Sequence, residues 1–495
     1  MAIPESFEGV RVTVMGLGLF GGGAGTARYL AREGARVTVT DLKTEADLAE
    51  SVELLSGTPA ELHLGGHDMA DFTDAGVVVA NPAVRPGSEF LAAARRAGVS
   101  VTTAAELAFR RCRELELPVI GVTGSNGKST TTAMIGAMLS GRRPPAPEPL
   151  VGGNIGGSLL EELGSAKRGT PVVMELSSFQ LHHLGAAGLS PHVAVVTNLA
   201  PNHIEWHGDV ESYYRAKAEI LRHQGEDDWA VLNLDDPESR RLDGVGRARR
   251  LGFSLERLAE GLEGTFLQRG FILLRTGGQA YSVAGADALR VPGHHNIANA
   301  LAAAAAASAA GATRGDIARG LGEFRGLPDR METIAFEGGV RYINDSVATT
   351  PESAAASLEA LGAPGPVVIL IAGGHDKGLD FSPLARAARG RVRAAALTGD
   401  AARRIADAMT AAAPAVALHY AEGVRRSTQL AAGLAREGET VLLSPGCSSY
   451  DEFRNYRDRA AAFRREVERL AADASRAGDA GDAGEAGGRD GAQTR

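Results

Sequence analysis

The sequence predicts an α/β protein with a Rossmann-like domain at each end and a P-loop, ATP-binding domain between them. Short runs rich in valine and isoleucine alternate with alanine-rich stretches, a pattern typical of parallel sheets covered by helices. Polar, glycine-containing loops follow several of these runs, as ligand-binding loops follow the strands of open α/β sheets. The 495 residues allow two to four domains, which agrees with this division.

Composition limits the class of protein. Two cysteines far apart in sequence, Cys112 and Cys447, exclude a disulfide framework and fit a reducing compartment. The first six residues lack the basic and apolar parts of a signal peptide, and the apolar runs 193–196 and 367–372 are too short to span a bilayer. A net charge of −8 gives no basic field for nucleic acid. We therefore expect a cytoplasmic protein without nucleic-acid partner or membrane insertion, and a monomer.

A predicted strand at 117–122 leads through a glycine-rich turn into a predicted helix at 133–139. Such a turn points several backbone N–H groups at one spot, where the helix dipole favours an anion. A lysine in the turn reaches terminal phosphates, and a following hydroxyl ligates Mg²⁺. Val122 stands where the general P-loop has glycine, and a helix start merely capped by glycine and serine is the alternative. The predicted phosphate loop consists of Gly124, Ser125, Asn126, Gly127, Lys128, Ser129 and Thr130.

The first domain carries a second glycine loop. Residues 16–21 fit G-x-G-x-x-G after a predicted strand, and Asp41 ends the next strand, as in dinucleotide-binding domains. The pattern requires a diphosphate near 18–23 and a polar partner near Asp41, which NAD and a uridine diphosphate sugar both satisfy. The alternative is a structural domain whose glycines only permit close helix packing.

Three further candidates lie at or near strand ends in the central domain. Glu175 ends one predicted strand, His203 lies in the loop after the next, and Lys217 lies in the predicted helix 210–222. Since the carboxyl ends of parallel strands face the ligand crevice, we expect Glu175, His203 and the phosphate loop to converge. A carboxylate beside a phosphate loop suits Mg²⁺. Lys217 by default is a surface charge, and spacing does not separate His203 from His192 and His207.

The remaining chain predicts hairpins at 270–284 and a third domain whose strands again end in polar loops. The expected limits are 1–113, 114–326 and 327–472. Beyond these, the Ala/Gly/Asp-rich segment 473–495 has too few apolar residues to fold and is predicted to be a disordered tail.

A series of short motifs follows in a fixed order: 123–130, 153–156, 175–181, 202–203, 216–217, 293–301, 326–330, 344–346 and 443–445. Together they resemble the Mur ligases of peptidoglycan precursor synthesis. The resemblance runs from about residue 10 to 470 and is closest to members that join glutamate to UDP-N-acetylmuramoyl-L-alanine, through Asn126, the Ser-Ser-Phe-Gln after Glu175 and residues 453–456. It implies ATP-dependent amide formation through an acyl phosphate.

The resemblance also implies roles for the catalytic candidates. Lys128 and the loop amides would hold the β- and γ-phosphates, with Ser129 and Glu175 on one Mg²⁺. His203 and a carbamylated Lys217 would hold a second Mg²⁺, since a cationic lysine has no lone pair for a metal. Asn154 would contact the UDP substrate beside the reaction centre, as would His203.

Three binding groups complete the set that the resemblance implies. ATP would also contact Asn299, Arg330 and Asp345. The uridine diphosphate end would contact Gly18, Leu19, Phe20 and Asp41. The glutamate pocket would consist of Thr349, Lys377, Ser449 and Tyr456.

Several positions depart from the family pattern. Val347 replaces a lysine, Asp329 a histidine and Asn202 an aspartate, and residues 81–83 replace Ser-Pro-Gly. A charge-assisted contact is worth roughly 1.5–3 kcal/mol, so losing the lysine would alter glutamate affinity or pose about ten- to a hundredfold. We expect D-glutamate rather than L-glutamate, although the sequence does not fix the stereochemistry.

Three other functions compete with this reading. The first is a nicotinamide-dependent oxidoreductase with an accessory nucleotide domain, which the loop 16–21 favours, although no hydride-transfer pair accompanies it. The second is a catalytically silent nucleotide-binding regulator. The third is a ligase with another acceptor, as in sister Mur ligases or folylpolyglutamate synthase.

Overall fold

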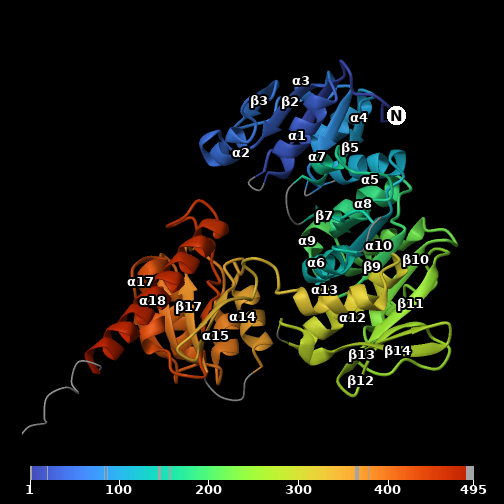
Figure 1. The fold of residues 1–495 in the computed structure, drawn as a ribbon. Helices are drawn as coiled ribbons and strands as arrows, with labels where there is room; N and C mark the ends of the chain where they lie inside the picture. The colour runs from blue at the N-terminus through green and yellow to red at the C-terminus, as the bar shows by residue number, and fades with distance from the viewer. Residues whose placement is uncertain are drawn as a thin grey trace, which may run out of the picture. The chain divides into compact units, whose positions relative to one another are not determined.

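The computed structural model describes residues 3–18, 21–82, 84–85, 87–142, 146–154, 158–291, 293–362, 367–376 and 378–485. The fold is α/β, with three separate sheets (Figure 1). The chain divides into two compact units: the first holds residues 1–289 and 295–324, and the second holds 290–294 and 325–495. The first two sheets lie in the first unit and the third in the second. The finer limits at 113/114 and 326/327 stay a prediction.

The first sheet is parallel, with strand order β3-β2-β1-β4-β5. The order reverses at β1, and such a reversal is where open α/β sheets bind ligands. The strands are β1 (Arg11–Met15), β2 (Arg36–Asp41), β3 (Ala60–Leu64), β4 (Val77–Ala80) and β5 (Ser100–Thr102). The helices are α1 (Gly22–Arg32), η1 (Ala46–Leu48), α2 (Ala49–Glu53), α3 (Met69–Thr73), α4 (Glu89–Arg96) and α5 (Ala104–Glu114).

The central sheet has the order β14-β13-β12-β11-β10-β9-β6-β8-β7. The seven strands β12, β11, β10, β9, β6, β8 and β7, in their order across the sheet, pair in parallel. Strands β12, β13 and β14 form antiparallel hairpins, as predicted for 270–284. The strands are β6 (Val119–Thr123), β7 (Leu150–Gly153), β8 (Val172–Glu175), β9 (Val193–Val196), β10 (Trp229–Asn233), β11 (Arg249–Ser254), β12 (Gly264–Gln268), β13 (Phe271–Thr276) and β14 (Gln279–Gly285).

The helices of this part are α6 (Lys128–Leu139), α7 (Leu159–Leu163), α8 (Ser178–Ala186), α9 (Ile204–His207), α10 (Val210–Arg222), α11 (Pro237–Arg240), η2 (Ala286–Ala288), α12 (His294–Ala309) and α13 (Arg314–Glu323). Strand β6 lies between β8 and β9, so the loops after these three strands emerge side by side. This topology brings the phosphate loop, Glu175 and the loop of His203 to one sheet edge.

The third sheet has the order β15-β16-β20-β17-β18-β19, parallel except for the β15–β16 hairpin. Along β17, Leu370 packs into one core with α14, α15 and α16, and Ile371 packs into another with α17 and α18. The strands are β15 (Glu332–Glu337), β16 (Val340–Asn344), β17 (Val368–Gly373), β18 (Val392–Thr398), β19 (Ala417–Tyr420) and β20 (Thr440–Leu443). The helices are α14 (Pro351–Ala360), α15 (Ser382–Ala388), α16 (Ala402–Ala412), α17 (Gly423–Leu434) and α18 (Tyr456–Glu485).

Helix α18 continues to Glu485, past the residue at which the disordered tail was predicted to begin. The disorder of the segment 473–495 stays a prediction. The first turns of α18 are anchored by Phe463 and Val467 in the core. A helix nucleated in this way propagates readily through alanine and arginine, and the glycines weaken it without ending it. Residues 486–495 lie outside the described residues.

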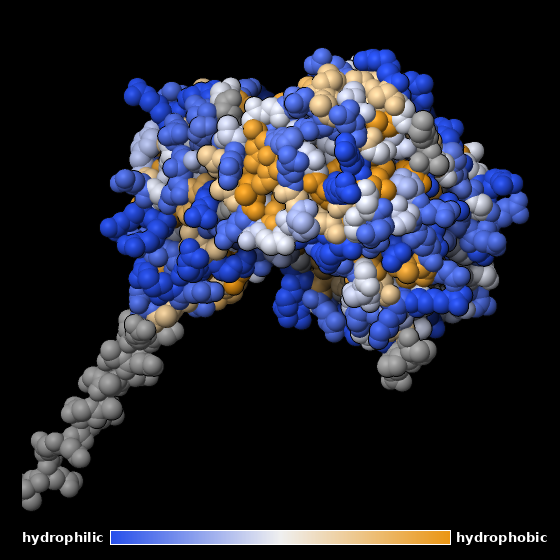
Figure 2. Space-filling model, turned by 90° about the horizontal axis from the view of Figure 1, so that it is seen from above, coloured by the Kyte–Doolittle hydropathy of each residue, from blue (hydrophilic) through white to orange (hydrophobic). Residues whose placement is uncertain are grey.

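The composition bears on the surface, the helices and the two cysteines. Hydrophilic side chains cover most of the face seen in Figure 2, with apolar ones in patches between them. Among the described helices, none is both long enough and apolar enough to cross a membrane. Both cysteines are buried free thiols, and burial raises the pKa of Cys112 to about 12.

Candidate active site

The phosphate loop forms directly after β6, and two of its positions require glycine. Gly124 has φ 148°, and a Cβ there would lie 1.9 Å from Thr197 Oγ1. Gly127 has φ 81°, and a Cβ there would lie 2.2 Å from Asn299 Oδ1. Lys128 then begins α6, and its Nζ donates to Ser125 O at 3.0 Å. The loop predicted from the sequence is therefore built from close backbone approaches that a side chain would block.

The loop after β9 holds the phosphate loop in place. Asn198 O accepts from Ser125 N at 2.8 Å, and Asn198 Oδ1 accepts from Asn126 N at 3.0 Å. Thr197 Oγ1 donates to Asn126 O at 2.6 Å. Sequence reasoning missed these two supporting residues. Their position immediately after a strand that neighbours β6 is the signal that identifies them.

Lys217 lies under the phosphate loop, with only 2 % of its surface exposed. Its Nζ donates to Gly124 O at 2.8 Å and lies 3.4 Å from Thr123 Oγ1. Burial, and secondly the nearby charge of Lys128, hold its pKa well below the usual range of a lysine. The default reading as a surface charge is therefore wrong, because the inner face of α10 carries this residue.

Glu175 and Asn154 meet beside the loop. Asn154 Nδ2 donates to Glu175 Oε1 at 3.2 Å, and Asn154 N donates to Glu175 O at 3.0 Å. Glu175 is 2 % exposed, and its Oε2 is buried without a hydrogen-bond partner. A buried carboxylate oxygen without a hydrogen-bond partner fits a hard cation such as Mg²⁺.

The described residues contain no group of three or more His, Cys, Asp or Glu side chains that could hold a metal by themselves. A cation here would therefore need hydroxyl, phosphate or carbamate oxygens in addition to the carboxylate of Glu175.

Tyr213 links His203 to the loop. Its hydroxyl lies 3.0 Å from Ser125 Oγ, its ring centre lies 4.9 Å from Lys217 Nζ, and the His203 ring lies 6.3 Å away. His203 itself caps α9 with a left-handed backbone, φ 53°, and its ring packs on Phe179 at 4.9 Å. Sequence reasoning missed Tyr213, whose signal is an aromatic residue one helical turn before Lys217.

His192 and His207, the two alternatives to His203, contact other parts of the central domain. His192 Nδ1 accepts from Val119 N at 3.0 Å, at the end of β6 away from the loop. His207 Nε2 lies 3.0 Å from Ser178 Oγ and stacks on Phe179. Of the three candidates, His203 and His207 therefore belong to the site region, and His192 does not.

The predicted ATP contacts divide between the two units. Asn299, in α12, lies against Gly127, and its Oδ1 accepts from Thr131 Oγ1 at 3.4 Å. Arg330 is exposed in the second unit.

Asp345, another predicted ATP contact in the second unit, is buried, whereas Arg330 is exposed. Its carboxylate accepts from Ser357 Oγ at 2.6 Å, Ser444 Oγ at 2.7 Å and Met331 N at 3.1 Å. Burial raises its pKa to about 6. Asp345 is therefore a buried, hydrogen-bonded carboxyl group in this structure, and its contact with ATP stays a prediction.

In the first domain, Asp41 contacts its own glycine loop. Its Oδ2 accepts from Leu17 N at 2.9 Å and from Gly18 N at 3.2 Å, and Ser51 Oγ donates to Gly18 O at 2.6 Å. The predicted contacts Leu19 and Phe20 lie outside the described residues. The amides expected to bind a diphosphate therefore already hold a carboxylate.

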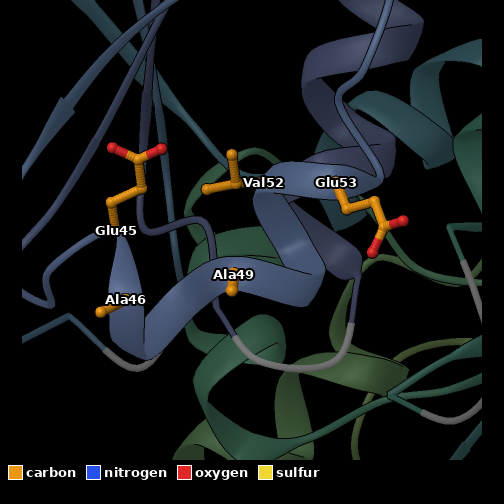
Figure 3. A pocket seen from close by; sticks show the side chains of 5 residues that line it. All are labelled: Glu45, Ala46, Ala49, Val52 and Glu53. Atoms are coloured by element: carbon orange, nitrogen blue, oxygen red, sulfur yellow. The ribbon is translucent and has the colours of Figure 1, made fainter.

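A shallow hollow lies on η1 and α2 of the same domain. It is lined by Glu45, Ala46, Ala49, Val52 and Glu53. The two carboxylates point apart rather than toward a common centre (Figure 3). Their negative charge opposes a diphosphate, so the hollow does not substitute for the glycine loop.

The predicted glutamate pocket lies in the second unit. Thr349 follows β16 and is half-buried, Ser449 follows β20 and is buried, and Tyr456 begins α18. Ser346 Oγ donates to Tyr456 O at 2.7 Å, which joins two of these segments. Lys377 lies outside the described residues.

The fold and the loop together define the class: an α/β P-loop protein with a buried lysine beneath the loop. Family models match the chain as the "Mur ligase MurD-like, N-terminal domain" over 10–103, the "Mur ligase middle domain" over 122–307 and the "Mur ligase, glutamate ligase domain" over 329–447. The chain belongs to the Mur ligase family, ATP-dependent ligases of peptidoglycan precursor synthesis that use Mg²⁺.

Relatives cover nearly the whole chain. A UDP-N-acetylmuramoylalanine–D-glutamate ligase of Roseiflexus sp. is 42 % identical over 471 residues, 93 % of this chain and 98 % of the relative. The protein of the same name from Symbiobacterium thermophilum is 37 % identical over 461 residues, with the same coverage. The crystal structure of UDP-N-acetylmuramate-alanine ligase from Thermotoga maritima matches with TM-score 0.60 at 22 % identity, over 94 % of this chain and all of that one, which shows the shared fold.

Proposed function

We propose that this protein joins D-glutamate to UDP-N-acetylmuramoyl-L-alanine at the expense of ATP, in peptidoglycan precursor synthesis. The observation that carries the proposal is the phosphate loop with Lys217 and Glu175 beside it, in a chain whose relatives over nine-tenths of its length bear that activity as their name. The substrate carboxylate attacks the γ-phosphorus and releases ADP. The amine of glutamate then attacks the acyl carbon, phosphate leaves, and the amine loses a proton.

Charge explains why the loop is built as it is. A carboxylate that attacks a triphosphate meets another anion, so the barrier falls only where positive charge is already positioned. Lys128 and the amides at the start of α6 would hold the β- and γ-phosphates. Asn299, against Gly127, and the exposed Arg330 would contact the rest of ATP.

Glu175 and Ser129 would hold one Mg²⁺, which neutralises phosphate charge when bound. His203 and a carbamylated Lys217 would hold a second. Burial lowers the pKa of Lys217, which favours the neutral amine over the ammonium form, and only the neutral amine reacts with carbon dioxide. Tyr213 would keep the side chains of Lys217 and His203 in one place.

The two other substrates would bind at the first glycine loop and at the predicted glutamate pocket. The uridine diphosphate would bind to the loop at Gly18 and to Asp41, and Asn154 would contact the muramoyl end beside Glu175. Glutamate would bind among Thr349, Ser449 and Tyr456, with Lys377. We also propose that the protein works in the cytoplasm as a monomer, which size-exclusion chromatography with light scattering tests.

Phosphate release measured with different acceptors tests the function. We expect release to require UDP-N-acetylmuramoyl-L-alanine and D-glutamate together, and to fail with L-glutamate, other amino acids or a folate. Turnover with another amino acid alone would assign a different acceptor. Release that ignores every acceptor would indicate a nucleotide-binding regulator instead.

A further inference from the structure

Arg459 ties together three segments of the second unit. It lies in the first turn of α18 and is 2 % exposed. Its Nε donates to Ser346 Oγ at 3.1 Å, and its Nη2 donates to Ser346 O at 2.9 Å and Cys447 O at 3.0 Å. The guanidinium therefore joins the loop after β16 to the loop after β20.

Two polar atoms at this junction lack a partner. Arg459 Nη1 and Ser448 Oγ are both buried, and neither has a hydrogen-bond partner among the described residues. Nη1 faces the backbone of Gly374, where an added Cβ would lie 3.1 Å from it. His375 N donates to Ser448 O at 3.0 Å, so the loop after β17 closes the same junction.

The guanidinium of Arg459 forms no ion pair in the part of the chain that the structure describes, and its hydrogen bonds go to a hydroxyl and two carbonyls. Burial lowers its pKa to about 10, although the nearby charges of Asp451 and Glu452 act in the opposite direction. A buried guanidinium nitrogen and a buried hydroxyl without partners are costly, so a ligand that accepts hydrogen bonds from both, such as a carboxylate, fits this junction.

The guanidinium of Arg459 lies next to Val347, the position at which this sequence lacks the lysine of the family pattern. Arg459 binds both the hydroxyl and the carbonyl of Ser346, the residue immediately before Val347, where the family pattern has a lysine. A positive charge is thus present beside this position, but it comes from α18 rather than from the loop.

We propose that Arg459 is a positioning residue for the acceptor amino acid, which orders the loops of Ser346 and Ser448 and supplies the positive charge that Val347 lacks for the acceptor's carboxylate. The proposal rests on the proposed function. It adds a specificity determinant outside the predicted pocket of Thr349, Lys377, Ser449 and Tyr456.

Steady-state kinetics of the full chain, varying each substrate in turn, test the proposal. We expect Arg459→Met to raise the KM for D-glutamate about ten- to a hundredfold, as loss of a charge-assisted contact does, with the KM values for ATP and the UDP substrate unchanged. Arg459→Lys should restore part of this loss, and Ser448→Ala should raise the same KM a few-fold. Arg465→Met removes an exposed arginine of the same helix and serves as the control.

A second substitution separates charge from structure. Val347→Lys added to Arg459→Met should lower the KM for D-glutamate again, because it returns a cation beside Ser346. An unchanged KM for D-glutamate in Arg459→Met, equal rises for all three substrates, or no rescue by Val347→Lys would each overturn the proposal. If the unaltered protein does not turn over D-glutamate, the proposed function fails before any variant is compared.

Discussion

Two glycine loops of the first unit follow similar sequence patterns but have opposite electrostatic surroundings. Each ends in a left-handed glycine that caps a helix, Gly21 with φ 79° and Gly127 with φ 81°. The first loop donates two of its N–H groups to the carboxylate of Asp41. The second has Lys128 at its end and Lys217 beneath it. One loop already holds an anion from its own chain, and the other presents the ammonium group of Lys128.

The difference shows what a glycine pattern does and does not determine. Left-handed glycines and a helix start create a concave row of donors in both places. The side chains that lie next to those donors decide which ligand they favour. Lys128 at the second loop favours the more highly charged triphosphate, and the carboxylate at the first loop favours a ligand that replaces or extends its hydrogen bonds.

The largest expected effect comes from removing the side chain of Lys217 beneath the second loop. Lys217→Ala should lower turnover at least 100- to 1000-fold, the range found when one group that stabilises developing charge is lost. Added small carboxylates should restore part of the activity if the carbamate is the active form. Turnover close to that of the unaltered protein would contradict both the role of Lys217 and the carbamate.

The next largest effect comes from adding a methyl group to a glycine of each loop, because the two loops differ in the space around that glycine. Gly124→Ala should abolish measurable ATP binding, because its Cβ would lie 1.9 Å from Thr197 Oγ1. Gly18→Ala has open space around the Cβ and only the strain of φ 69°, so we expect a loss of roughly tenfold in affinity for the UDP substrate. Isothermal titration of each ligand measures both, and equal losses in the two variants would contradict the comparison.

A smaller effect tests the carboxylate at the first loop. Asp41→Asn should raise the KM for the UDP substrate about tenfold, because the variant loses a charge-assisted contact at the first loop. The KM for ATP should stay unchanged, because ATP binds at the second loop. Tighter binding by the variant would mean that Asp41 competes with the diphosphate for the loop amides. Steady-state kinetics measure the KM values, and isothermal titration with the UDP substrate shows whether the variant binds it more tightly or more weakly.

The smallest effect concerns stability. The pKa of Lys217 is lowered on folding, so between this folded value and the unfolded one near 10.5 the unfolded chain holds a proton that the folded protein lacks. Stability therefore rises with pH in this window, by at most about 1.4 kcal/mol per pH unit from this group. Lys217→Met should remove that slope and raise the melting temperature, more so at lower pH. Melting curves from pH 6 to 9 check this, and a parallel slope in both proteins would contradict it.

Local stereochemistry explains which parts of the site the sequence could predict. Gly124 and Gly127 were predictable because the glycine requirement and the lysine that follows are encoded within a few residues. Glu175 was predictable because a strand end has a known direction in a parallel sheet. These predictions needed no knowledge of how distant segments pack.

The parts that sequence reasoning missed depend on tertiary packing. Which face of α10 is buried decides whether Lys217 is a surface charge or a loop contact, and Tyr213 follows from the same face. The hydrogen bonds that Asp345 accepts from Ser357 and Ser444 likewise join segments that lie far apart in the chain. Arg459 lies three residues beyond the motif 453–456, and its role depends on loops more than 10 and 110 residues away in the chain.

The burial of both thiols has a practical consequence. Cys112 and Cys447 are the only cysteines of the chain, and neither presents its sulfur to solvent. A maleimide dye therefore has no exposed native target, and a cysteine introduced on the surface is labelled alone. A cysteine introduced at Leu42 in the first unit, or at Arg465 in the second, would therefore carry the label by itself and report on its own surroundings.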